Sequence, residues 1–293
     1  MGYKTYTCPH AARCGGCEWL SVPYPIQLSR KRAMLEELFE PLGCGVDAVV
    51  GMEEPIAYRH KIMTPYAPGK EGKPRLGMYE RGTHKLIEVR ECLVEHKAGR
   101  PILNSIAELA QGFHISAYDE NTGKGLLRHA IVRVGKSTGQ IMVTLVVNRK
   151  EFPRKKAFVT ALRKRHPAIE SVSFSVNTRR TNAVLGPLTM TAYGQGWIED
   201  EICGCTFRIS AQSFYQVNPV QTEILYQKAI EAAGLTGKET VLDAYCGIGT
   251  IGLIAASVPL ASLPPSRRVS SLSAWRASRP RYKSQRKTRA SIA

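Results

Sequence analysis

Three cysteines near the start of the chain have the spacing of a metal- or cluster-binding loop. Cys8, Cys14 and Cys17 are separated by five and two residues, and two glycines fill the shorter gap. Glycine makes a tight turn easy, so two sulfurs can reach one metal or cluster. A fourth ligand is needed, and Cys92 is the best candidate. Four thiolates suit either tetrahedral zinc or an iron–sulfur cluster, and the spacing leaves both open.

A glycine turn later in the chain has the pattern of a ligand-binding loop. Asp243, Gly247 and Gly249 follow a β-branched run and precede an apolar helical stretch. The glycines let the backbone approach a ligand, and the helix N-terminus behind them favours an anionic group. This pattern is similar to the first motif of S-adenosylmethionine-dependent methyltransferases. Gly252 completes a G-x-G-x-x-G match, so a dinucleotide-binding turn is an open alternative.

The remaining cysteines have no such constellation. The chain has eight cysteines, and without a signal peptide these favour metal binding or catalysis over disulfides. We expect buried or incidental thiols at Cys44, Cys203, Cys205 and Cys246.

Hydrophobic periodicity predicts an antiparallel α+β domain between the two motifs, followed by the first strand–turn–helix unit of a doubly wound domain. The expected helices are at residues 25–39, 102–109, 155–164, 220–233 and 251–256. The expected strands are at residues 76–79, 86–89, 130–134, 140–147, 171–176, 206–209 and 239–243.

The charge balance favours a polyanionic partner. The net charge is +17 with a pI near 9.7, which is typical of nucleic-acid-binding proteins. Nine of the Lys and Arg residues, and no Asp or Glu, lie in residues 257–293, which leaves +8 on the first 256 residues. No apolar run is long enough to span a membrane, and the N-terminus lacks a signal-peptide pattern. We therefore expect a monomeric cytoplasmic protein without membrane contact.

The pattern changes abruptly after residue 256. In a doubly wound domain, a second parallel strand that ends in an acidic residue is expected within about 20 residues of the glycine turn. Residues 257–293 are instead rich in Ser, Arg and Pro, a composition that favours disorder. We hypothesise a reading-frame shift near codon 256, with a true basic RNA-binding tail as the alternative.

Five segments together resemble the bacterial ribosomal RNA uracil-C5 methyltransferases, in the order expected for that family. They cover roughly residues 5–256. The segments are Cys8–Trp19, Tyr58–Lys61, Glu91–Cys92, Ser213–Pro219 and Asp243–Thr250.

The resemblance implies a fold, two cofactors and their ligands. The fold is an α+β central domain with an iron–sulfur loop, followed by the first part of a Rossmann-like S-adenosylmethionine methyltransferase domain. A four-iron cluster is implied on Cys8, Cys14, Cys17 and Cys92. S-adenosylmethionine is implied at Gln216, Asp243, Tyr245, Gly247, Gly249 and Thr250.

The reaction of this family needs two further catalytic residues, a cysteine and a carboxylate. A cysteine thiolate adds to uracil C6, C5 takes the methyl group, and a carboxylate removes the C5 proton. The family places that cysteine and that carboxylate well downstream of the glycine turn. No residue here matches them, so we expect an inactive copy.

These observations lead to three hypotheses for the function. The first is methylation of a uridine in 23S ribosomal RNA. The second is an iron–sulfur RNA-binding module without catalysis. The third is a tRNA uracil-C5 methyltransferase, which the cysteine loop disfavours because bacterial tRNA members generally lack one.

The expected domains are residues 1–205, which bind the cluster and RNA, residues 206–256, which begin the methyltransferase domain, and the tail at 257–293. Basic positions in the first domain are candidate phosphate contacts. Those named as RNA-binding are Arg59, Lys61, Arg128 and Arg133.

Overall fold

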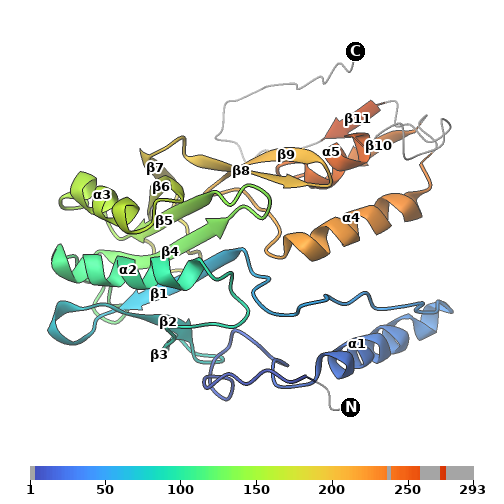
Figure 1. Cartoon of the computed structure of the whole chain (residues 1–293), viewed down its shortest axis with the longest axis horizontal. Helices are drawn as coiled ribbons and strands as arrows, with labels where there is room; N and C mark the ends of the chain where they lie inside the picture. The colour runs from blue at the N-terminus through green and yellow to red at the C-terminus, as the bar shows by residue number, and fades with distance from the viewer. Residues whose placement is uncertain (1–3, 236–238, 258–270, 275–293) are drawn as a thin grey trace. The chain divides into compact units, whose positions relative to one another are not determined.

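A computed structural model describes residues 4–235, 239–257 and 271–274 of the chain (Figure 1). The chain divides into two units. The first holds residues 1–202 and 206–224, and the second holds residues 203–205 and 225–293. The expected domain boundary at residue 205 remains a prediction, although the units change over mainly at residue 224.

A seven-stranded sheet forms the first unit, in the order β3-β2-β1-β4-β5-β6-β7. Two helices, α2 (Gly99–Gly112) and α3 (Lys155–Arg165), pack on it. The strands are β1 (Lys61–Ala67), β2 (Arg75–Tyr79), β3 (Leu86–Glu88), β4 (Leu127–Val134), β5 (Ile141–Val147), β6 (Ile169–Val176) and β7 (Leu188–Tyr193).

The core lies between the sheet and these two helices. Val143 and Leu145 of β5 are fully buried and share one apolar cluster with Ile102 and Ile106 of α2 and Phe158 of α3. Every residue of β4 and β5 is buried. Continuous burial means that both faces of the central strands are covered, and β8 (Trp197–Ile202) also packs against β5 and β6.

The expectation of a wholly antiparallel domain is wrong at one strand pair. β5 and β6 run parallel, with Val143 opposite Val172. A parallel pair needs a crossover of a dozen or more residues, and α3 lies in the segment between the two strands. The other neighbouring strands of this sheet are antiparallel.

The remaining elements of the first unit lie outside the seven-stranded sheet and its two helices. α1 (Tyr24–Phe39) has no buried residue, and it ends through a 3-10 turn, Glu40–Leu42, at Gly43 with positive φ. A second 3-10 turn spans Lys70–Gly72. β8 pairs with β9 (Cys205–Ser210), and α4 (Pro219–Ala233) follows and runs from the first unit into the second.

The second unit contains the strand–turn–helix expected from sequence. β10 (Thr240–Asp243) leads into α5 (Thr250–Ser257). The expectation of disorder after residue 256 is corrected for one stretch, because β11 (Ser271–Ala274) pairs in parallel with β10. A parallel neighbour supplies the hydrogen bonds that β10 would otherwise lack. The rest of residues 258–293 lies outside the described residues.

No helix in the described ranges is both long and apolar enough to cross a membrane.

Candidate functional site

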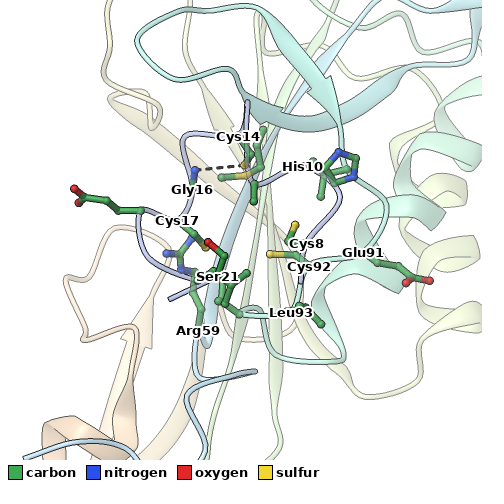
Figure 2. A pocket seen from close by; sticks show the side chains of 16 residues that line it. Cys8, His10, Cys14, Gly16, Cys17, Ser21, Arg59, Glu91, Cys92 and Leu93 are labelled. Atoms are coloured by element: carbon green, nitrogen blue, oxygen red, sulfur yellow. Dashed lines mark hydrogen bonds between the residues drawn. The ribbon is translucent and has the colours of Figure 1, made fainter. Parts of the chain in front are cut away.

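The four cysteines singled out in the sequence line one cavity of about 60 Å³ (Figure 2). Cys8, Cys14 and Cys17 come from the N-terminal loop, and Cys92 comes from the segment after β3. All four are free thiols and half-buried. The fold therefore brings together thiols that are up to 84 positions apart in the sequence.

The hairpin of β2 and β3 supports the N-terminal loop. Gly15 N–H donates to Tyr79 O at 3.1 Å, and Arg81 N–H donates to Arg13 O at 3.0 Å. The Arg13 guanidinium also bonds Glu80 at 2.7 Å. A Cβ on Gly15 would come within 3.4 Å of hairpin backbone, so the glycine permits this close approach.

A buried ion pair supports the loop that carries Cys92. Arg100 donates to both carboxylate oxygens of Glu95 at 2.6 and 2.7 Å, and also to Val89 O at 3.1 Å. On the other side, Ala57 N–H donates to Leu93 O at 2.7 Å. The Cys92 backbone is therefore fixed from both sides.

Burial raises the pKa of the Cys17 and Cys92 thiols. For Cys17 the neighbouring Cys92 adds to the rise, and the Arg59 guanidinium opposes it. For Cys92 the Glu95 carboxylate adds to the rise, while the N–H groups of Val94 and Glu95 lower the pKa. Both thiols are therefore protonated near neutral pH unless a cation replaces the proton.

The donor set suits a thiolate-bound metal or cluster, but the sulfurs do not converge on one point. Among the described residues, no group of three or more Cys, His, Asp or Glu side chains is arranged to hold a metal ion. Gly16 N–H donates instead to the Cys14 sulfur at 3.4 Å (Figure 2). Four thiols around one small cavity match the ligand type and number of zinc and iron–sulfur sites.

The glycine turn joins β10 to α5 in the second unit. Gly247 and Gly249 have φ of 57° and 83°, a region that other residues rarely adopt. Gly249 N–H closes the turn on Cys246 O at 2.6 Å. Tyr226 Oη and Thr250 Oγ1, 2.9 Å apart, tie the first turn of α5 to α4.

Two side chains of this turn are available to a ligand. Asp243 Oδ2 is buried and has no hydrogen-bond partner within the described part of the chain. Tyr245 is 93% exposed. A buried carboxylate oxygen without a donor is costly, so a ligand hydroxyl or amine that donated to it would be stabilised. The turn thus fits a ligand with such a donor, such as S-adenosylmethionine.

Gln216 lies in the first unit, within a segment without helix or strand that is held on both sides of it. The Arg133 guanidinium donates to Ser213 O at 2.9 Å, Tyr215 Oη donates to Asp200 at 3.2 Å, and His60 N–H donates to Val217 O at 2.8 Å. Gln216 itself is half-buried.

Phe214 shares this segment and was missed in the sequence. It is 71% exposed, whereas Tyr215 beside it is buried.

Two of the four expected phosphate contacts are buried in β4. Arg128 donates to Asn177 O at 2.6 Å and to Arg179 O at 2.8 Å, and Arg133 bonds Ser213 as above. They are only 5% and 2% exposed. Arg128 Nε and Arg133 Nε and Nη1 have no hydrogen-bond partner among the described residues. Burial nevertheless keeps both guanidinium groups out of reach of a phosphate at the surface, so the expectation that Arg128 and Arg133 contact phosphate is corrected.

The other two expected contacts are half-buried. Arg59 lines the cysteine cavity. Lys61 lies opposite Arg133 in the sheet, and burial, with Arg133 second, lowers its pKa. Both remain candidates for RNA contact.

Comparisons with known proteins identify relatives over most of the chain. No protein-family model matches it. An uncharacterized RNA methyltransferase of Halalkalibacterium halodurans is 41% identical over 253 residues, which is 85% of this chain and 55% of that protein. One from Caldanaerobacter subterraneus is also 41% identical, over 85% of this chain and 56% of that protein. The chain thus spans about half the length of these relatives.

A solved structure has the same fold. The Pyrococcus abyssi tRNA (uracil-54, C5)-methyltransferase, in complex with S-adenosyl-L-homocysteine, matches with a TM-score of 0.68 and 26% identity. The match covers 85% of this chain and 57% of that one. The similarity to RNA methyltransferases that the motifs predicted is confirmed.

Proposed function

Because the chain is related over 85% of its length to RNA methyltransferases, we propose that it functions in the S-adenosylmethionine-dependent C5 methylation of a uridine in RNA. The observation that carries this proposal is the turn after β10. It combines two positive-φ glycines with a buried Asp243 oxygen that has no hydrogen-bond partner among the described residues.

Asp243 accepts a hydrogen bond from the cofactor in this proposal, and Gly247 and Gly249 let the backbone approach it. Tyr245 offers an exposed ring for stacking, and Thr250 begins the helix behind the turn. Gln216 contributes a further polar contact. When bound, S-adenosylmethionine supplies an electrophilic methyl group.

The nucleophile and the general base are assigned to no described residue. The family pattern places both after residue 256, and Cys246 lies within the cofactor turn itself. The described residues therefore bind and orient the cofactor and the RNA.

A four-iron cluster on Cys8, Cys14, Cys17 and Cys92 is the second part of the proposal. Its support is the shared cavity and the choice of cysteine at all four positions. Such a cluster would link the N-terminal loop to the Cys92 loop. Zinc on the same thiolates is the alternative.

The RNA substrate is 23S ribosomal RNA in this proposal, bound by a monomer. The family resemblance of the cysteine loop supports it. Transfer RNA is the second candidate, and one observation favours it, namely the likeness to the Pyrococcus abyssi tRNA enzyme.

The test is photo-crosslinking of radiolabelled S-adenosylmethionine to the chain, with unlabelled competitors. We expect S-adenosylhomocysteine to abolish labelling and NAD to leave it unchanged, with the label in residues 239–250. Competition by NAD instead would support a dinucleotide site and overturn the proposal.

A further inference from the structure

Five cations gather where three loops meet at one end of the central sheet. They come from the loops that precede β4, follow β5 and follow β6 (Figure 1). These strands are neighbours in the sheet. We call this surface the basic edge, and its residues are Lys124, Arg149, Lys150, Arg179 and Arg180.

We propose that the basic edge binds the phosphate backbone of the RNA substrate, at a distance from the target nucleotide. This inference rests on the proposed function, since it assumes an RNA substrate. Hydrogen bonds between the three loops hold the backbone that carries these cations, so their positions are fixed relative to one another.

Buried polar side chains hold the three loops together. The Arg128 guanidinium reaches across from β4 and donates to Asn177 O and Arg179 O. Asn177, 1% exposed, donates to Ala183 O at 2.6 Å and to Val184 O at 2.9 Å. The loop after β6 is therefore fixed from both sides, with Arg179 and Arg180 on it.

The loop after β5 is joined to the loop before β4 in the same way. Asn148 N–H donates to Leu126 O at 2.8 Å, and its side-chain amide lies 3.4 Å from both Gly123 O and Gly125 O. Arg180 packs so closely on Gly123 that a Cβ there would lie 2.3 Å from its guanidinium.

The cations of the basic edge are exposed and unpaired. None of the five forms an ion pair with an acid in the described ranges, whereas Arg13, Arg100 and Arg165 elsewhere do. Unpaired cations that are held close together repel one another, and a polyanion relieves that repulsion.

Nearby acids do not neutralise this surface. The Asp119 carboxylate accepts bonds from Asn121 N–H at 2.9 Å and Thr122 Oγ1 at 3.0 Å, and these lower its pKa, so Asp119 keeps one negative charge on this loop at neutral pH. Glu120 bonds Tyr79 and His84. Glu151 is exposed beside Lys150, so the five cations exceed the three nearby acids, Asp119, Glu120 and Glu151, by two charges.

The basic edge lies at the opposite end of β4 from the Gln216 segment. Arg128 supports the basic edge, and Arg133, five residues along the strand, supports Ser213. A strand rises about 3.3 Å per residue, so the two supports are roughly 17 Å apart. Contacts this far from the target base position RNA without reading its sequence.

The test measures binding of a uridine-containing RNA hairpin by fluorescence anisotropy across a salt series. The variant is R149A/K150A/R179A/R180A. The matched control, R30A/K31A/K70A/K97A, removes the same charge from exposed positions elsewhere. We expect the variant to lose about 3 from the slope of log affinity against log salt, and at least tenfold in affinity near 0.1 M salt. The control should stay within about threefold.

A charge-preserving variant, R149K/R179K/R180K, separates charge from folding. It should keep the salt slope, because an ammonium group also neutralises phosphate. Equal binding by the alanine variant and its control overturns the basic edge while leaving RNA binding intact. Absence of salt-dependent binding by the unmodified chain overturns both the basic edge and the proposed RNA substrate.

Discussion

Arg100 and Glu95 form an ion pair with two hydrogen bonds, at 2.6 and 2.7 Å, and Glu95 lies three residues after Cys92, which completes the thiol set. Both side chains are almost fully buried. Arg100 also donates to Thr64 Oγ1 at 2.9 Å in β1. The pair thus connects the Cys92 loop to the sheet.

Removing one partner of this pair should destabilise the first unit. We expect Arg100→Met to lower the free energy of unfolding by about 3–5 kcal/mol, because it leaves the Glu95 carboxylate buried without a counter-charge. Urea unfolding followed by circular dichroism measures this. The exposed pair of Arg32 and Glu36 is the control, and Arg32→Met should cost less than about 1 kcal/mol. Equal costs would contradict the structural role.

The thiol set predicts a selective effect of cysteine substitution on metal content. We expect the anaerobically purified chain to hold about four iron and four sulfide ions, and Cys92→Ser to lose most of both. Cys44→Ser is the matched control, since Cys44 is exposed and lies outside the cavity. Iron, sulfide and zinc assays decide the outcome. Zinc without sulfide would replace the cluster with a zinc site.

His129 predicts a pH dependence of stability. Burial, with Arg128 second, lowers its pKa to about 4 from 6.5. The unfolded chain therefore binds a proton between about pH 6.5 and 4 that the folded chain does not, so unfolding becomes easier as pH falls through this window, by up to about 3 kcal/mol. Above about pH 6.5 the contribution of this group is constant.

The variant His129→Gln should lose this part of the pH dependence. Urea unfolding at pH 7 and pH 4.5 measures the difference for the wild type, for His129→Gln and for the exposed control His114→Asn. A pH dependence unchanged in His129→Gln would contradict a neutral buried imidazole.

A side chain at Gly249 should destabilise the turn between β10 and α5. Its φ is 83°, and an added Cβ would meet Leu253 at 3.3 Å. We expect Gly249→Ala to cost about 1–2 kcal/mol in the second unit and to weaken cofactor binding. Gly112→Ala is the control, because a Cβ there meets nothing within 4 Å. Limited proteolysis between residues 239 and 257 reports the loss of order.

The sequence predicted most elements because their periodicity is local. The hairpin of β2 and β3, the helices α1 to α4 and the β10–α5 unit all lie where the pattern placed them. The parallel pairing of β5 with β6 could not be predicted in this way, because strand direction depends on how the α3 segment crosses the sheet.

The sequence identified the residue types of the candidate sites, but it could not show which of these side chains are buried or what they contact. Four cysteines with cluster spacing do share one cavity. The sequence suggested that Arg128 and Arg133 are surface cations. Their hydrogen-bond acceptors, the carbonyl groups of Asn177 and Ser213, lie far along the chain and cannot be identified from the neighbouring residues. β11 was missed because four residues are too few to show a strand pattern, and only pairing with β10 defines the strand.

The most direct test of the central claim is calorimetric titration of the chain with S-adenosylmethionine, comparing the wild type with Asp243→Asn. Asp47→Asn, at an exposed position, is the matched control. We expect saturable binding by the wild type and the control, and at least tenfold weaker binding by Asp243→Asn, as for loss of a charged hydrogen bond of about 1.5–3 kcal/mol. Binding that is absent in the wild type, or unchanged in Asp243→Asn, would contradict the cofactor site and with it the proposed methyltransferase function.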